Sequence, residues 1–303
     1  MPLPSSGTLE LSRIAVTDGA NSVGVVTPYS LYQLNSLAGL QYNFGNEISN
    51  FYSYGGYGYK YGSPDILHDF GLSSRYSTSS SNIIDTSGNG RNATFVTGTG
   101  TGTPTNITGY TTTFPANIAT QTSNQRAIRL DSTSKYGGNT TFTWIAWFKV
   151  TSFSTSYNGI IACEGRSGST PIGHSLYINN IGNYNIVYER FNGTSGTSNA
   201  ITLPFNSGGA PAFQLNKWYL AMISYSSSYY HMYLRGADWN ATYGTNGGFV
   251  STSVAIDFAW ANFAGLRYNN WLDGHIGYVA TYSTLFNGAD YNSIWDRTQK
   301  RYV

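Results

Sequence analysis

The run Phe142–Val150, Phe-Thr-Trp-Ile-Ala-Trp-Phe-Lys-Val, constrains the fold more than any other stretch of the chain. A helix of this apolarity would need about ten or more residues, with apolar side chains three and four apart. The run is instead short and rich in aromatic and β-branched residues, and Gly-Gly-Asn precedes it at 137–139, which favours a strand. Successive side chains of a strand point to opposite faces, so Trp144 and Trp147 lie on different faces. We therefore predict a central strand that is covered on both sides.

The residue types in the rest of the chain indicate strands and turns. The 303 residues include 26 tyrosines and 35 glycines, and only 10% are charged. Tyrosine, threonine, valine and phenylalanine favour strands, whereas glycine and asparagine favour the turns between them. This profile excludes intrinsic disorder and a helical bundle. The net charge of +2 gives no electrostatic argument for nucleic-acid binding, and we expect neither a signal peptide nor a membrane-spanning segment.

Short apolar or alternating runs recur along the chain at regular intervals. We predict strands over residues 93–96, 127–131, 159–164, 174–178, 184–189, 218–225, 229–234, 249–255, 261–266 and 275–282. The strand at 127–131 is expected to lie next to the central one. Such spacing is typical of a β-sandwich or barrel. Residues 288–297 differ and predict one short helix at the C-terminus.

The first 62 residues predict a separate N-terminal module, which places the large β domain at residues 63–303. The module ends in a Tyr/Gly tract of low complexity at residues 51–62. Two interpretations of this tract remain open. It is either a flexible linker or a segment packed against a neighbouring subunit, or it forms an adhesive surface on which sugars stack.

Four pieces of the β domain occur in an order that resembles the concanavalin A-like, laminin-G-like lectin jelly rolls. They are Asp-Thr-Ser-Gly-Asn-Gly at 85–90, Phe-Thr-Trp-Ile-Ala-Trp-Phe-Lys at 142–149, Trp-Tyr at 218–219 with Tyr-Leu-Arg-Gly at 233–236, and Leu-Asp-Gly-His-Ile-Gly-Tyr-Val at 272–279. Arg235 departs from the family, which usually has Asn there. The resemblance implies an all-β fold: a two-sheet antiparallel jelly-roll sandwich with a short C-terminal helix, preceded here by a small, irregular N-terminal anchor.

The N-terminal residues 3–14 are similar to the start of many tailed-phage virion proteins. This resemblance implies a phage virion structural protein: a capsid decoration protein, a head fibre or a tail-associated protein that displays the lectin-like domain toward host-surface glycans. It would be made in the host cytoplasm and become extracellular on lysis. Residues 1–62 would bind other virion proteins, and the resemblance alone implies a homo-oligomer such as a trimer. The alternative is a stand-alone soluble glycan-binding lectin, followed by a glycoside hydrolase.

The distribution of reactive side chains favours binding over catalysis. Retaining glycoside hydrolases need two carboxylates roughly 5–5.5 Å apart, and the hydrolase branch of the family resembles Glu-x-Asp-x-x-Glu on one strand. No such run occurs, and none of the glutamates has a carboxylate two or three residues away: Glu10, Glu47, Glu164 and Glu189. Cys163, the only cysteine, is expected in the core, and the four histidines show no metal-ligand spacing. We therefore predict that the protein is not an enzyme.

Two binding sites are predicted, one for a glycan and one for calcium. Exposed aromatic rings stack on sugars while Asn and Asp bind the hydroxyl groups. The candidates, for each of which packing against a neighbouring subunit is the alternative, are Tyr157, Trp239, Tyr243, Asn269, Asn270, Trp271 and Asp273. Lectins of this superfamily often bind calcium, and the candidate ligands are Asp85, Asn89 and Asp131. The alternative is that Asp85 caps its own turn through backbone N–H groups.

Overall fold

The computed structural model describes residues 64–69, 82–83, 85, 87, 89–96, 105–107, 111–113, 127–130, 141–153, 156–167, 170–192, 198–248, 261–263, 272–299 and 302. The chain divides into two units, Asp65–Tyr291 and the two chain ends, Met1–Pro64 with Asn292–Val303. The predicted N-terminal module and the strand predicted at 249–255 lie outside the described residues. The boundary near residue 62 therefore stays a prediction.

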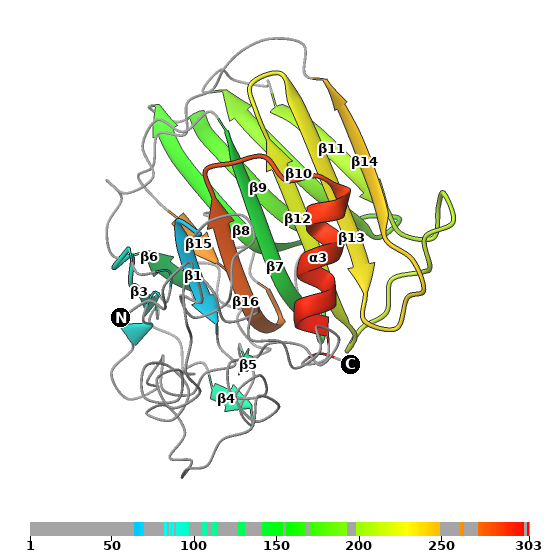
Figure 1. Ribbon diagram of the computed structural model, residues 1–303, viewed down its shortest axis with the longest axis horizontal. Coiled ribbons are helices and arrows are strands. Elements are labelled where there is room, and N and C mark those ends of the chain that lie inside the picture. The colour runs from blue at the N-terminus through cyan, green and yellow to red at the C-terminus, as the bar shows by residue number, and fades with distance from the viewer. Residues whose placement is uncertain are drawn as a thin grey trace, which may run out of the picture. The chain divides into compact units, whose positions relative to one another are not determined.

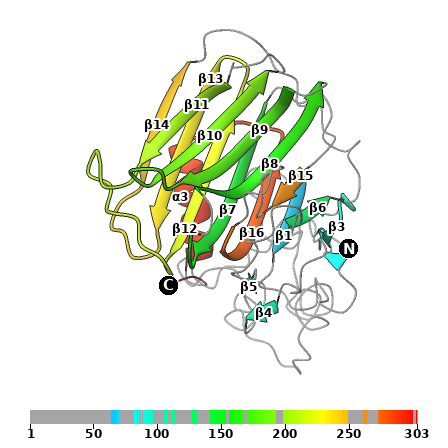
Figure 2. The same ribbon diagram turned by 180° about the vertical axis from the view of Figure 1, so that it is seen from behind.

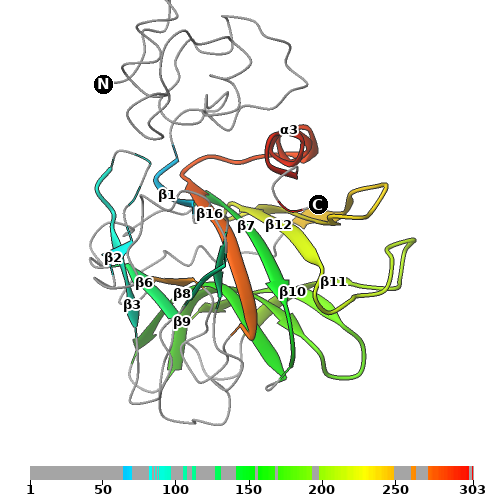
Figure 3. The same ribbon diagram turned by 90° about the horizontal axis from the view of Figure 1, so that it is seen from below.

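The unit Asp65–Tyr291 is a sandwich of two antiparallel sheets (Figures 1 and 3). Sheet A has the order β14-β13-β12-β7-β16-β5-β4, and β1 also pairs with β16. Its strands are β1 Ile66–Asp69, β4 Thr105–Ile107, β5 Thr111–Thr113, β7 Phe142–Val150, β12 Trp218–Tyr225, β13 Tyr229–Gly236, β14 Tyr243–Gly248 and β16 Gly274–Tyr282. Together with sheet B, they confirm the predicted all-β fold of two antiparallel sheets.

Sheet B has the order β11-β10-β9-β8-β15-β6-β3-β2, and Figure 2 shows its long strands side by side. Its strands are β2 Asn82–Ile83, β3 Ala93–Val96, β6 Ala127–Leu130, β8 Tyr157–Ser167, β9 Thr170–Asn179, β10 Asn185–Asn192, β11 Ser198–Pro204 and β15 Ala261–Phe263. Strands β8 and β9 form a hairpin, and both extend further toward the turn between them than the strands predicted at 159–164 and 174–178.

Strand β7 is central, as predicted from its two apolar faces. It is hydrogen-bonded to β12 on one side and to β16 on the other. Trp144 and Trp147 are both 0% exposed. Trp144 belongs to the core between the sheets and stacks on Phe142 with ring centroids 4.7 Å apart, whereas Trp147 lies on the opposite face. Burial of each of these rings stabilises the fold by about 2 kcal/mol or more.

The predicted position of the strand at residues 127–131 is wrong. The structure places β6 in sheet B, where it pairs with β3 and β15 and not with β7. Both edges of β7 are already taken by β12 and β16, so no further strand can pair with it. The sequence pattern identifies the strand correctly but carries no information about its sheet.

The predicted C-terminal helix is confirmed as α3, Gly288–Thr298. Asn287 caps it: its side-chain oxygen accepts hydrogen bonds from the N–H groups of Ala289 and Asp290, and the Asp290 carboxylate accepts one from the Asn287 N–H. In the first turn, the Tyr291 hydroxyl donates to the Leu220 carbonyl oxygen at 2.8 Å. Within the described ranges, no helix is long and apolar enough to cross a membrane.

Strand β14 forms one edge of sheet A and is rich in glycine. A Cβ atom at Gly244 would overlap the Tyr233 ring, and one at Gly247 would lie 3.0 Å from the Tyr230 hydroxyl. Side chains from β13 therefore cover the backbone of this edge strand, and larger residues would displace them.

Candidate functional site

Several loops meet at one end of the sandwich, because each joins strands that leave their sheets at that end. Backbone hydrogen bonds connect these loops: Asn180 N–H to Ser156 O (3.1 Å), Phe205 N–H to Tyr184 O (3.0 Å) and Asn216 N–H to Val150 O (2.8 Å). We call this surface the loop end. Its described residues are 151–153, 156, 180–184, 205–217 and 237–242.

Three aromatic rings from three different loops converge at the loop end. Tyr184 stacks on Phe153 with ring centroids 5.2 Å apart and an interplanar angle of 24°. Phe213 lies 5.0 Å from Tyr184 and 5.5 Å from Phe153. Tyr184 is 39% exposed, whereas Phe213 is 8% exposed. We call these three residues the aromatic rim; Tyr184 is its solvent-facing ring and Phe213 its buried support.

The turn that carries Tyr184 is fixed by local polar contacts. The Asn179 side-chain oxygen accepts a hydrogen bond from the Ile181 N–H at 2.8 Å, and the Asn185 side-chain amide donates to the Asn183 carbonyl oxygen at 2.8 Å. Gly182 has a φ of 76°, a conformation that glycine adopts without steric cost. Asparagine and glycine in this turn therefore hold the Tyr184 backbone in place before any ligand arrives.

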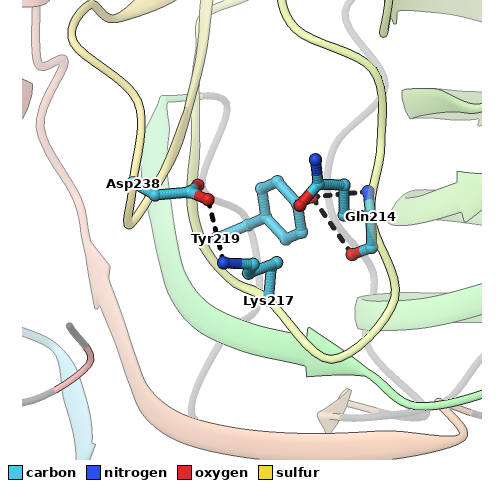
Figure 4. Close-up of polar contacts among 4 residues, drawn as sticks. All are labelled: Gln214, Lys217, Tyr219 and Asp238. Atoms are coloured by element: carbon cyan, nitrogen blue, oxygen red, sulfur yellow. Dashed lines mark hydrogen bonds and ion pairs between the residues drawn. The ribbon is translucent and has the colours of Figure 1, made fainter.

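The loop that carries Phe213 is tied to β12 by the Tyr219 hydroxyl (Figure 4). This hydroxyl accepts a hydrogen bond from the Gln214 N–H at 2.8 Å and donates one to the Gln214 carbonyl oxygen at 3.1 Å. Burial raises the pKa of Tyr219 to about 12, so the hydroxyl keeps its proton and remains a donor at neutral pH. The Tyr219 ring also stacks on Phe213 with centroids 5.1 Å apart.

A nearby ion pair contributes less to the same loop. The Lys217 ammonium lies 3.0 Å from the Asp238 carboxylate, and both side chains are 46% exposed (Figure 4). Exposed pairs of this kind stabilise by about 0–1 kcal/mol because water screens them. The hydroxyl of Tyr219 therefore contributes more to fixing the loop than this ion pair does.

Trp239 is not the exposed loop ring that the sequence predicts. It is 7% exposed and packs against Phe205 and Tyr219, with ring centroids 5.8 and 5.6 Å away. The absence of a side chain at Gly236 leaves room for it, since a Cβ atom there would come within 2.7 Å of the indole nitrogen. Tyr243 is half-buried and meets Trp239 edge-on at 5.4 Å. Tyr243 thus remains a candidate surface ring, supported by the buried tryptophan.

Tyr157 is the first residue of β8 and does not lie in a loop as predicted. Its ring meets Tyr177 edge-on, with centroids 5.5 Å apart. Both belong to a small apolar cluster separate from the core between the sheets. The Tyr177 hydroxyl donates to the Glu189 carboxylate at 2.9 Å. Tyr157 therefore lies on the outer face of sheet B and not in the aromatic rim.

Asp273 is fully buried and holds the start of β16 against the loop after β7. Its carboxylate accepts a hydrogen bond from the Ser152 hydroxyl at 3.2 Å, and its carbonyl oxygen accepts one from the Thr151 N–H at 2.7 Å. The predicted role as a surface ligand for sugar hydroxyls is therefore wrong. Asn269, Asn270 and Trp271 lie outside the described residues.

The calcium prediction fails at Asp85, because protein donors occupy its carboxylate. One oxygen accepts from the N–H groups of Leu67 (2.9 Å) and Ser87 (3.0 Å), and the other from the Ser87 hydroxyl (2.7 Å) and the Arg91 N–H (2.8 Å). A carboxylate offers about four acceptor positions, so none remains for a cation. Asn89 is exposed and donates to the Asp65 carbonyl oxygen. Asp131 lies outside the described residues, and the described ones hold no group of three or more His, Cys, Asp or Glu side chains suited to a metal.

The hydrogen bonds also determine the protonation of Asp85. Burial would raise the pKa of this carboxyl, but the bonds from the Ser87 hydroxyl and from the Leu67, Ser87 and Arg91 N–H groups outweigh burial and lower it. Asp85 is therefore a carboxylate that caps its own turn and fixes it to β1.

None of the three rings of the aromatic rim was among the residues predicted from the sequence to bind a glycan. The one available clue was the five-residue gap between the strands predicted at 174–178 and 184–189, which puts Tyr184 at the tip of a β-hairpin. Phe153 and Phe213 are 60 residues apart in the sequence, and only the pairing of β7, β12, β9 and β10 brings their loops together.

No protein-family model matches the sequence, and no curated protein matches it in sequence. Solved structures share the fold. Domain 4 of AbnA, an extracellular GH43 arabinanase from Geobacillus stearothermophilus solved with arabinotriose, has a TM-score of 0.51 at 12% identity, covering 77% of this chain and 98% of that domain. A Trypanosoma rangeli sialidase solved with the inhibitor DANA has a TM-score of 0.53 at 10% identity, covering 96% of this chain but only 38% of the sialidase.

These likenesses, at 10–12% identity, show the fold alone. They nevertheless overturn one expectation from the sequence. The prediction that the protein is not an enzyme is wrong as an exclusion, because a domain of an arabinanase and a sialidase share its sandwich.

Proposed function

We propose that the loop end of the sandwich binds carbohydrate, with Tyr184 as the ring on which a sugar stacks. The observation that carries this proposal is the aromatic rim, in which a solvent-facing tyrosine lies parallel to Phe153 and is supported from below by Phe213. Sugar sites combine such rings with a few polar groups that bind hydroxyls. The exposed side-chain amides of Asn183 and Gln214, next in sequence to Tyr184 and Phe213, are described groups of that kind.

The hydrogen-bonded backbone conformation of the loops supports the same proposal. Asn206 and Asn216 adopt positive φ angles of 57° and 62°, and the Asn206 N–H donates to the Pro211 carbonyl oxygen at 3.1 Å. Preformed loops lose little conformational entropy when a ligand binds, which matters for sugars because each contact with them is weak. The AbnA domain was solved with arabinotriose and the sialidase with sialic acid, which agrees with a sugar as ligand.

The test compares two tyrosines of similar exposure at opposite ends of the sandwich. Tyr184 is 39% exposed, and Tyr229, next to the β12–β13 turn, is 37% exposed. On a glycan array followed by calorimetry, Tyr184→Ala should weaken binding about three- to tenfold, the equivalent of one aromatic contact. Tyr229→Ala should leave the affinity unchanged. Equal losses in both variants, or no glycan bound by the wild-type chain, would exclude the rim as the site.

We further propose that the protein is a phage virion structural protein that displays a concanavalin A-like jelly roll for host-surface binding. The resemblance of residues 3–14 to tailed-phage virion proteins supports this proposal, and a homo-oligomer attached through residues 1–62 follows from the same resemblance. Mass spectrometry of particles purified after lysis tests it. The full-length chain should be present at a fixed ratio to the capsid protein, and its absence from the particles contradicts the virion role.

A part in glycan hydrolysis is the second candidate, favoured by the glycoside hydrolases among the solved structures of the same fold. The described carboxylate to test first is Glu189, which is half-buried and accepts a hydrogen bond from Tyr177. Release of reducing ends from arabinan or of sialic acid from sialyllactose, lost in Glu189→Gln, supports this candidate. No release by the wild-type chain from either substrate counts against it.

A further inference from the structure

Three side chains from neighbouring strands form a group on the outer face of sheet A. Lys149 of β7 lies opposite Trp218 of β12 and opposite His275 of β16 in the strand register. The residue next to each in the sequence belongs to the core between the sheets: Phe148, Tyr219 and Ile276. Lys149, Trp218 and His275 therefore point away from this core. We call them the cationic corner.

The corner combines a cation with an aromatic surface. The Lys149 ammonium lies 5.0 Å from the centroid of the Trp218 ring, within the range of a cation–π contact. The His275 ring meets Trp218 at 6.0 Å and 62°. Lys149 and Trp218 are half-buried, so both remain accessible to a ligand.

Lys149 has no carboxylate partner among the residues that the structure describes. Lys217, which directly precedes Trp218 in the sequence, instead forms an ion pair with Asp238. The sequence explains part of this difference, because residues 86–130, which include strand β5 beside β16, contain no Asp or Glu. A half-buried ammonium without a counter-ion is stabilised by any anion that reaches it.

His275 supplies a second and independent observation. It is 6% exposed, and within the described part of the chain neither ring nitrogen has a hydrogen-bond partner. Buried polar groups are nearly always paired, so an unpaired imidazole beside an unpaired ammonium indicates a place for an acceptor. Burial and the charge of Lys149 lower the pKa of His275 to about 4, so the neutral ring offers one N–H donor at pH 7.

The backbone fixes this geometry. Gly274 lies so close to β7 that a Cβ atom there would overlap the Lys149 carbonyl oxygen. A register shift between Ile276 and Tyr278 inserts one extra residue in β16 directly after the corner. Such bulges change the direction of a strand and are frequent beside functional sites. The close contact and the bulge together hold His275 against Lys149.

We propose that the cationic corner binds the carboxylate of an acidic sugar, with Lys149 and His275 as donors and Trp218 as the surface on which the sugar ring rests. This inference rests on the carbohydrate binding proposed above and adds the class of sugar. The corner borders the loop end, because Lys149 is near the end of β7 and Trp218 begins β12, directly after the loop that ends at residue 217. One charged hydrogen bond gives the acidic sugar about a tenfold preference over its neutral counterpart.

The test uses the full-length chain and matched pairs of probes in calorimetry: trigalacturonic acid with its methyl ester, and 3′-sialyllactose with lactose. The wild-type chain should bind the acidic member of at least one pair about tenfold more tightly. Lys149→Met should abolish the preference, Lys149→Arg should keep most of it, and Lys217→Met, which removes an equal charge nearby, should leave it unchanged. Thermal melts of each variant show whether it is folded.

The outcomes separate this inference from the proposed function. Equal affinities for the acidic and neutral members overturn the corner but leave carbohydrate binding in place. Binding of neither member contradicts both. Competition by acetate at the same concentration as the acidic sugar shows a simple anion site and overturns the sugar assignment. A preference that survives in Lys149→Met also overturns it, since the anion then binds elsewhere.

Discussion

The carboxylate of Asp85 offers the sharpest test of the interactions that hold the fold together. Asp85 is 6% exposed and accepts four hydrogen bonds from Leu67, Ser87 and Arg91. In Asp85→Asn, one oxygen becomes an amide nitrogen, which cannot accept from the Arg91 N–H. The variant loses hydrogen bonds to a charged acceptor and leaves a backbone donor unpaired, so its free energy of unfolding at pH 7 should fall by about 3 kcal/mol.

Urea unfolding measures this change as a lower midpoint with an unchanged slope. Asp238→Asn, which alters a carboxylate that is 46% exposed in a surface ion pair, should cost less than about 1 kcal/mol and serves as the control. The difference between wild type and Asp85→Asn also depends on pH. The folded state lowers the pKa of Asp85 below 3.8, so its stabilisation is complete above that pH and disappears as the pH falls through the folded-state pKa.

The same experiment distinguishes a turn cap from a calcium ligand. Because protein donors occupy the carboxylate, a chelator should leave the melting temperature of the wild-type chain unchanged. A chelator that lowers wild-type stability to the level of Asp85→Asn would refute the capping argument, as would a loss below about 1 kcal/mol in the variant.

Three further predictions concern the two sites. Gly274→Ala should destabilise the chain by about 3 kcal/mol, because the new methyl group would overlap the Lys149 carbonyl oxygen; a urea midpoint within experimental error of wild type would contradict this. His275 has a folded-state pKa of about 4 against 6.5, so the unfolded chain binds its proton more tightly, and stability should fall by roughly 2–3 kcal/mol as the pH drops from 6.5 to 4. Urea unfolding of His275→Phe across that range should lack this part of the decline, and an identical pH profile would show that another group causes it. Tyr219→Phe removes the hydroxyl that is hydrogen-bonded to the backbone N–H and carbonyl oxygen of Gln214, and it should lower the free energy of unfolding in urea by about 1–2 kcal/mol. Tyr229→Phe, at the opposite end of the sandwich, should lower it by less than about 0.5 kcal/mol. Equal losses would argue against the role of the Tyr219 hydroxyl.

The sequence predicts where the strands of this fold lie better than it predicts which strands pair with each other. Large apolar residues at both odd and even positions of Phe142–Val150 were sufficient to identify a central strand with two buried faces, because successive side chains point to opposite faces. The strand at Ala127–Leu130 was also identified, but not its sheet. Strand pairing depends on which edges are already taken, and a short alternating pattern does not contain that information.

The exposure of the candidate site residues could not be predicted from the sequence either. Trp239 follows a strand in a polar stretch, which is typical of an exposed loop residue, yet Phe205 and Tyr219 bury it. Asp273 was predicted to bind sugar hydroxyls at the surface, and it is buried where β16 meets the loop after β7. In both cases the exposure of a side chain is set by residues far away in the sequence. The turn at Asp85 was predictable because its donors, apart from Leu67, lie within six residues.

The glycines of β14 bear on how this protein behaves when many copies are crowded together. An exposed strand at the margin of a sheet can recruit a strand of another molecule and start fibril growth. Tyr-Gly-Thr-Asn-Gly-Gly is a poor partner for such growth, since glycine disfavours extended pairing, and the Tyr233 and Tyr230 rings already lie against its backbone. Substituting valine at 244 and 247 would displace those rings and leave a margin open to intermolecular pairing, so we expect that chain to form thioflavin-positive aggregates at concentrations where the natural one stays dispersed.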